Sequence, residues 1–152
     1  KGYQRRCVME KSLNAYIREQ FQLKEVDIRT YSPLALAYIG DGVFDLIIRS
    51  VVVDGGNIGV NRMHQRTSHI VKAQTQSKMA EKLQAFFTEE ERNIYRRGKN
   101  ANASTRAKNA TLADYHRATG LEAVFGYLYL NDRFDRILFL VQEGIAQIKE
   151  RI

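Results

Sequence analysis

Two acidic residues, Asp41 and Glu122, lie within apolar segments and are the first candidates for chemistry. Asp41 lies in the most apolar stretch of the chain, residues 34–53, and Glu122 is the only charged residue of segment 121–130. An ionised carboxylate is costly to bury unless a cation compensates its charge, so each acid either has a structural partner or binds a cation. Two such acids on two inner helices favour a shared hard cation, most naturally Mg²⁺ with carboxylate and water ligands.

Asp45 has a simpler explanation than Asp41. Asp41 and Asp45 are four residues apart and share one helix face, and Arg49 follows Asp45 at the spacing of a helical ion pair. Asp41 has no basic residue within four positions and is interpreted as buried. It also lies between Gly40 and Gly42, each of which weakens a helix by roughly 1 kcal/mol relative to alanine. The glycines therefore indicate close approach by another helix or backbone, and a site at Asp41.

The positive charge of the chain is concentrated in one segment. The net charge is +7, from 24 basic and 17 acidic residues, and segment 92–108 holds six bases and no acid. Such a segment indicates a polyanionic partner, although a basic loop kept only for solubility is the alternative. Lysine and arginine contact phosphates, and asparagine can reach sugar hydroxyls. The residues predicted to contact a nucleic-acid backbone are Arg96, Arg97, Lys99, Asn100, Arg106, Lys108 and Asn109.

The same segment contains no aromatic residue between positions 96 and 109. Single-stranded nucleic acid is commonly bound by stacking its bases on aromatic side chains. The composition of the segment therefore favours recognition of a duplex backbone.

The elements that must position these residues are all helical. Hydrophobic residues recur at helical spacing and no segment alternates with a period of two, which predicts an all-α helical bundle in a single domain, residues 1–152. Ser32-Pro33 is a helix start, and Thr88 with Glu91 forms a capping box. The segment 34–53 is apolar nearly all round and is expected at the centre of the fold. The predicted helices cover residues 8–21, 34–53, 59–87, 88–98, 111–130 and 133–151, with an exposed loop over 99–109.

Several classes of protein and site are disfavoured. A single cysteine, Cys7, excludes an intramolecular disulfide and fits a reducing compartment. No apolar run follows the basic residues 1–6, so no signal peptide is expected. The charges within 34–53 would cost several kcal/mol in a bilayer, so no membrane span is expected.

The chain begins with Lys1, and whether its first residues are native stays open. His64 and His69 are five residues apart, a poor spacing for shared metal ligation.

Several ordered motifs resemble the ribonuclease III family. Residues 38–45, Tyr-Ile-Gly-Asp-Gly-Val-Phe-Asp, resemble its signature helix, and residues 119–130 resemble its second metal-binding helix. Residues 96–100, 108–110, Tyr115 and 118–120 resemble specifically Mini-ribonuclease III, the short branch that lacks a double-stranded-RNA-binding domain. The resemblance spans about residues 31–130.

This resemblance implies an all-helical homodimer that hydrolyses phosphodiesters in double-stranded RNA and leaves 5′-phosphate and 3′-hydroxyl ends. It implies that Asp41 is the catalytic carboxylate, that Glu122 is its metal-binding partner, and that Mg²⁺ is the cofactor. It further implies maturation of large-subunit (23S) ribosomal RNA precursors in the bacterial cytoplasm, with a ribosomal protein as a candidate helper.

The chain also departs from the pattern of full-length ribonuclease III. Further acids usually stand four positions before the catalytic aspartate and three before the glutamate, where this chain has Ala37 and Thr119. We interpret this as a feature of the short branch, but the number of metal ions stays open, as does a secondary role for Asp45. The alternative is a non-catalytic duplex-RNA-binding protein of the same fold, which the two missing acids favour and the retained Asp41 and Glu122 oppose. A DNA-binding helical protein is more remote, because no recognition-helix motif is found.

Overall fold

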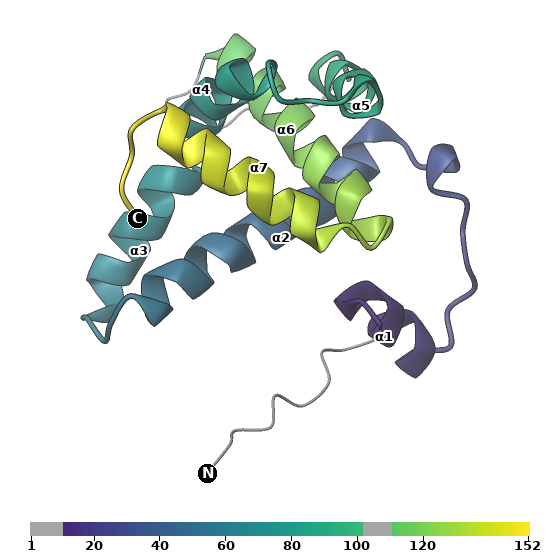
Figure 1. Ribbon diagram of the computed structural model, residues 1–152, viewed down its shortest axis with the longest axis horizontal. Coiled ribbons are helices and arrows are strands. Elements are labelled where there is room, and N and C mark those ends of the chain that lie inside the picture. Colours follow the sequence, from purple (N-terminus) through teal and green to yellow (C-terminus); the bar gives the residue numbers. More distant parts are fainter. Residues whose placement is uncertain (1–10, 102–110) are drawn as a thin grey trace.

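The computed structural model describes residues 11–101 and 111–152, and every regular element in these ranges is a helix (Figure 1). The predicted all-α fold is therefore confirmed for the described part of the chain. The elements are α1 (Leu13–Gln20), a 3₁₀ turn η1 (Ile28–Thr30), α2 (Pro33–Asp54), α3 (Val60–Val71), α4 (Ala73–Leu83), α5 (Glu89–Lys99), α6 (Leu112–Leu130) and α7 (Phe134–Gln147).

Helix α6 is the centre of the bundle, with α2, α4, α5 and α7 packed around it (Figure 1). Its segment from Ala118 to Tyr129 is buried except at Glu122 and Tyr127, and Phe125 packs on Phe44 of α2 with ring centroids 5.3 Å apart. Helix α2 was expected at the centre because it is apolar nearly all round. That prediction is only partly right, because one side of α2 packs on α6 and the other leaves Tyr38 84% and Leu46 54% exposed.

Helices α2 and α6 touch backbone to backbone. A Cβ atom added at Gly40 would lie 1.7 Å from the carbonyl oxygen of Glu122, and one added at Gly126 would lie 1.8 Å from the carbonyl oxygen of Leu36. No side chain fits at either position. The close approach predicted at Gly40 is confirmed, whereas Gly42 faces open space and does not contribute to it.

The single helix predicted over residues 59–87 is wrong, because the chain breaks at Lys72. Lys72 has an extended backbone, with φ −64° and ψ 153°, between α3 and α4. Two side chains of the next turn bind carbonyl oxygens of α3: Thr75 Oγ1 donates to His69 (2.7 Å) and Gln76 Nε2 donates to Val71 (2.8 Å). The helical spacing of hydrophobic residues continues across Lys72, so this spacing could not predict the break between α3 and α4.

Several predicted helix ends are also corrected. Ser12 caps α1, its Oγ accepting from the Ala15 N–H at 3.0 Å, so α1 begins later than the predicted Val8, and residues 8–10 lie outside the described ranges. Helix α7 ends at Gln147 rather than near Arg151. Gly98 does not end α5 but lies inside it, where a Cβ would come within 2.8 Å of the Ala123 Cβ. The capping box of Thr88 and Glu91 is confirmed.

None of the helices within 11–101 and 111–152 combines the length and the apolar character that a bilayer crossing requires.

Candidate active site

Asp41 and Glu122 line one cavity of about 450 Å³ between α2, α4 and α6. The backbone contact described above explains their proximity, because Gly40 meets the carbonyl of Glu122 and Asp41 is the next residue along α2. The polar side chains that line the cavity with them are Tyr38, Lys72, Gln76, Tyr115 and Thr119. Two acids that are 81 positions apart in the sequence therefore share one pocket.

Glu122 is held in an environment that disfavours its negative charge. Burial raises its pKa most, and the negative charge of Asp41 and a hydrogen bond with Asp41 raise it further, to about 8. A hydrogen bond from the Gln76 amide lowers the pKa but does not compensate. Asp41 itself is exposed, so the interpretation of Asp41 as a buried acid is wrong. The acid pair has one sheltered member and one that solvent reaches.

The acid pair fits a divalent cation. In the described part of the chain neither acid forms a salt bridge, although the exposed Lys72 lines the same cavity, so no ion pair offsets their mutual repulsion. Gln76 is 2% exposed, and its Oε1 is buried without a hydrogen-bond partner. Carboxylate and amide oxygens are the ligand types that suit Mg²⁺. Residues 11–101 and 111–152 contain no group of three or more acidic, histidine or cysteine side chains arranged to hold a metal ion, so two carboxylates would leave most of an octahedral shell to water.

The positions of the two missing acids lie in the same cavity. Ala37 and Thr119 both line it, and the Thr119 hydroxyl is engaged, donating to the Tyr115 carbonyl oxygen at 2.9 Å. Neither residue supplies a carboxylate. The cavity thus offers one acid from α2 and one from α6.

Asp45 is not part of this cavity. Its carboxylate accepts from Arg49 Nε at 2.6 Å, one turn along α2, and the predicted ion pair is confirmed. This pairing gives Asp45 a partner within its own helix, unlike Asp41.

The described members of the predicted RNA-contacting set lie at the end of α5. Arg96, Arg97, Lys99 and Asn100 are all exposed. Lys99 and Asn100 line a pocket of about 320 Å³ with His116 and Arg117 of α6. His116 directly follows Tyr115, which lines the cavity of the acid pair, so residues of the two pockets are neighbours along α6. Arg106, Lys108 and Asn109 lie outside the described residues.

Lys72 and Gln76 line the cavity, and the sequence predicted neither of them at this site. Lys72 is exposed and lines the cavity beside the acids, where its ammonium group could contact a phosphate. The sequence predicted one continuous amphipathic helix through both positions, which gives neither side chain a reason to face the acids. Predicting their place would have required a sequence signal for the helix break at Lys72.

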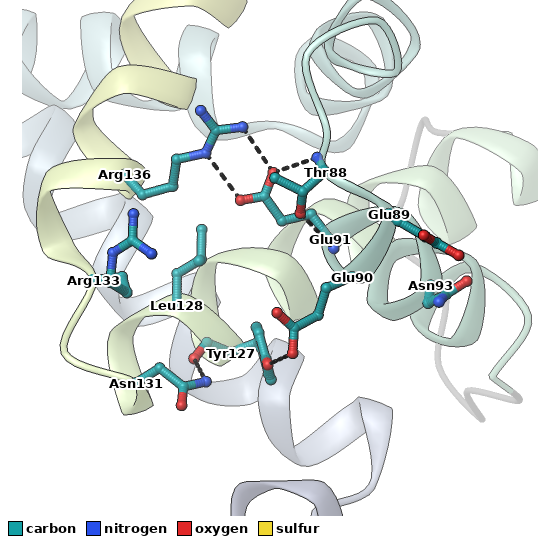
Figure 2. Close-up of a pocket in the computed structure, with 10 residues that line it drawn as sticks. All are labelled: Thr88, Glu89, Glu90, Glu91, Asn93, Tyr127, Leu128, Asn131, Arg133 and Arg136. Carbon is teal, nitrogen blue, oxygen red and sulfur yellow. Dashed lines mark hydrogen bonds and ion pairs between the residues drawn. The ribbon is translucent and has the colours of Figure 1, made fainter.

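A larger cavity, about 960 Å³, lies elsewhere and is also lined by acids, Glu89, Glu90 and Glu91 (Figure 2). Two of the three acids have partners. Arg136 donates two hydrogen bonds to Glu91, each 2.9 Å, and the Thr88 backbone N–H donates a third. Burial alone would raise the pKa of Glu91, but these hydrogen bonds outweigh it and hold the pKa below its usual value. Tyr127 donates to Glu90. We therefore assign this cavity a structural role despite its size.

Comparison with known proteins agrees with the geometry. Residues 34–133 match the family model described as the ribonuclease III domain. The chain is 39% identical over 130 residues to a Mini-ribonuclease 3 of Clostridium tetani, covering 83% of this chain and 85% of that protein. It is 37% identical over 142 residues to a Mini-ribonuclease 3 of Thermoanaerobacter, covering 93% of this chain and 100% of that protein.

A third relative and a solved structure give the same picture. A Mini-ribonuclease 3 of Staphylococcus aureus is 38% identical over 82% of this chain and 94% of its own length. A crystal structure of a Fusobacterium nucleatum protein superposes with a TM-score of 0.72 at 32% identity, covering 78% of this chain and 96% of that one. Both the sequence and the helical arrangement are therefore similar to those of known proteins along most of the chain.

Proposed function

Because the chain belongs to the Mini-ribonuclease 3 family, and so to the ribonuclease III endoribonucleases, we propose that it cleaves double-stranded RNA in a reaction that requires Mg²⁺. The observation that carries this proposal is the meeting of Asp41 and Glu122 in one cavity without a cationic partner. The exposed basic end of α5 supports a duplex substrate, because it offers phosphate contacts from non-aromatic side chains.

Asp41 and Glu122 are the proposed catalytic and metal-binding residues. These two carboxylates would hold a divalent cation, which would supply charge stabilisation for the phosphate and a water molecule of lowered pKa for hydrolysis. Glu122 must give up its proton to bind, since its pKa of about 8 keeps it largely protonated at neutral pH without a cation. Asp41, which is exposed, supplies the carboxylate that the substrate reaches first.

The basic residues orient the duplex relative to these acids. Lys72 lies beside the acid pair, where its charge would attract the scissile phosphate. Arg96, Arg97, Lys99 and Asn100 extend the contact along α5, and Arg106, Lys108 and Asn109 are proposed to continue it. Phosphate contacts of this kind fix register without reading bases, so specificity would depend on duplex shape.

We propose that the active form is a homodimer with two sites that each cut one strand. The exposed apolar side chains of α2 support this, since Leu34, Tyr38 and Leu46 are 38%, 84% and 54% exposed. A two-fold interface would bury this face and relate two acid pairs by symmetry.

The proposed substrate is a precursor of the large-subunit (23S) ribosomal RNA in the cytoplasm, cut to leave 5′-phosphate and 3′-hydroxyl ends. This finer assignment follows from the family resemblance alone. The resemblance also makes a ribosomal protein that presents the cleavage site an expected helper.

Incubation with duplex RNA, with and without Mg²⁺, tests the proposal, with Asp41→Asn compared with Asp45→Asn. Removing a metal-binding carboxylate should slow cleavage by about a hundredfold or more, since even outer-shell partners of a metal are worth roughly 10- to 100-fold. Asp45→Asn removes a charge from the same helix but outside the cavity and should change the rate by less than about threefold.

Cleavage that continues without Mg²⁺, or equal losses in the two variants, would contradict the proposal. Binding of RNA without any cleavage would favour the non-catalytic alternative. Competition between A-form RNA and B-form DNA duplexes tests the nature of the substrate, and equal competition would contradict recognition of RNA.

A further inference from the structure

Gln76 is a buried polar residue of the cavity to which the proposed function assigns no role. It lies in the first turn of α4, is 2% exposed, and lines the cavity together with Asp41 and Glu122. Among the described residues that line this cavity, it alone has a buried side-chain polar atom, Oε1, with no hydrogen-bond partner. Such an atom is costly to bury, so its place beside the acid pair needs an explanation.

The orientation of the Gln76 amide is fixed by its neighbours. Nε2 lies 2.8 Å from the Val71 carbonyl oxygen, and because a carbonyl oxygen can only accept, the NH₂ group must face Val71. The amide also makes a hydrogen bond that stabilises the charged form of Glu122, which requires donation from the second N–H. Both donors are therefore engaged and Oε1 is left without a donor to accept from.

A hydrated cation would supply the missing donor. Mg²⁺ bound by only one or two carboxylates keeps several water molecules, and each of these has hydrogens that need acceptors. Carbonyl groups near a metal commonly accept from its ligands and orient them. Of the described side chains in this cavity, Gln76 offers a buried acceptor that is still available.

We propose that Gln76 is a positioning residue of the metal site: its Nε2 orients the Glu122 carboxylate, and its Oε1 accepts a hydrogen bond from a water molecule of the cation's hydration shell. This rests on the proposed function, because it assumes that Asp41 and Glu122 hold the cation. It assigns Gln76 a role toward the ion without making it a direct ligand.

The competing explanation is that Gln76 only maintains the break between α3 and α4. Thr75, its neighbour, provides a matched control. Thr75 is also buried, at 4% exposure, and its hydroxyl binds the His69 carbonyl oxygen on the same broken turn, but it does not line the cavity of the acid pair. Thr75→Val removes this link and keeps the shape of the side chain.

The experiment is a calorimetric titration of the RNA-free protein with Mn²⁺, using wild type, Gln76→Met, Thr75→Val and Asp41→Asn. We expect Gln76→Met to weaken Mn²⁺ binding by about 10- to 100-fold. Thr75→Val should bind within about twofold of wild type, even though both variants lose a buried hydrogen bond and melt about 3 °C lower. Asp41→Asn should weaken binding at least as much as Gln76→Met.

Each contrary outcome has one meaning. Equal weakening by Gln76→Met and Thr75→Val would reduce Gln76 to a structural link and overturn the inference. Unchanged binding in Gln76→Met, with loss in Asp41→Asn, would overturn the inference and leave the proposed function standing. Unchanged binding in Asp41→Asn would overturn the proposed function itself.

Should Gln76→Met fail to fold, Gln76→Asn replaces it. Asparagine keeps the amide but is one methylene shorter, so it cannot span from Val71 to Glu122 and the ion. It should also bind Mn²⁺ at least about fivefold more weakly, and wild-type affinity in a folded Gln76→Asn variant would overturn the inference.

Discussion

Glu91 and Glu122 are both sheltered glutamates next to the core, yet their environments have opposite effects. Glu91 is 4% exposed and accepts hydrogen bonds from Arg136 and from the Thr88 backbone, which hold its pKa below the usual value (Figure 2). Glu122 is less buried but faces Asp41, and its pKa rises to about 8. Both glutamates are sheltered, so burial alone does not identify the functional acid. What distinguishes Glu122 is that no arginine or lysine of the described residues forms an ion pair with it, whereas Arg136 pairs with Glu91.

The same contrast separates the two cavities. Two of the three acids of the larger cavity have hydrogen-bond partners, whereas, within the described ranges, the smaller cavity contains two acids without a salt bridge and an unpartnered amide oxygen. The larger cavity is therefore not the one that we propose as the active site. The predictions below test whether the acids at the two places differ as this account requires.

The largest effect is expected at the backbone contact beneath the acid pair. Gly40→Ala would place a Cβ 1.7 Å from the Glu122 carbonyl oxygen and force α2 from α6, lowering the free energy of unfolding by about 3 kcal/mol or more. Gly42→Ala is the matched control, because its Cβ would meet open space and alanine favours a helix by about 1 kcal/mol. Urea denaturation measures the free energy of unfolding of both variants. Equal stability of the two variants would show that the backbone contact between α2 and α6 does not contribute to stability.

Arg136→Met tests the structural acid. It leaves Glu91 buried without its cation and should cost about 3 kcal/mol of unfolding free energy. Arg133→Met, which breaks an exposed ion pair with Asp135, should cost less than about 1 kcal/mol. The cleavage rate per folded molecule of Arg136→Met should stay close to that of wild type. A folded Arg136→Met variant that no longer cleaves RNA would place Glu91 in the active site and contradict its assignment as a structural acid.

A smaller effect is expected from the pH dependence of stability in metal-free protein. The pKa of Glu122 is about 8 in the folded state against an ordinary 4.5, so between these pH values the folded state binds more protons than the unfolded state. Stability must therefore fall as pH rises from about 4.5 to 8. Glu122→Gln should remove this part of the fall, measured by thermal unfolding in the presence of a chelator. An identical pH profile in wild type and variant would show that Glu122 is not destabilised by its surroundings.

The smallest effect is expected at the basic end of α5. Lys99→Ala should weaken duplex RNA binding about equally for all sequences and lower the salt dependence of the binding constant by about one unit of slope. Lys82→Ala changes a lysine on α4 outside both acidic cavities and should leave the slope unchanged. Filter binding over a range of salt concentrations measures the slopes. Equal slopes in wild type and Lys99→Ala would remove Lys99 from the RNA contact.

Much of the fold could be predicted from the sequence because the signals are local. Ser32-Pro33, the capping box at Thr88 and the apolar periodicity each act within a few residues, and they place α2, α5 and α6 to within a few positions of the structure. The pairing of Asp45 with Arg49 was predictable for the same reason. The break at Lys72 was not, because it depends on two side chains binding carbonyl oxygens of the preceding helix, and such bonds leave no periodic pattern.

The candidate site was predicted through its acids but not through its surroundings. Glu122 is conspicuous as the only charge of its apolar segment, and Asp41 as an acid with no base at helical spacing, while Gly40 indicated the close approach that joins them. Gln76 and Lys72 come to the cavity only through the turn between α3 and α4. The exposure of Asp41 was also missed, because it depends on which side of α2 packs against α6. Local sequence does not specify that choice.

The most direct test is the position of a divalent ion in a crystal soaked with Mn²⁺ and measured for anomalous scattering. The account predicts a peak between the carboxylates of Asp41 and Glu122, at ligand distance from both. A peak in the larger cavity beside Glu89, Glu90 and Glu91, with none between Asp41 and Glu122, would contradict it.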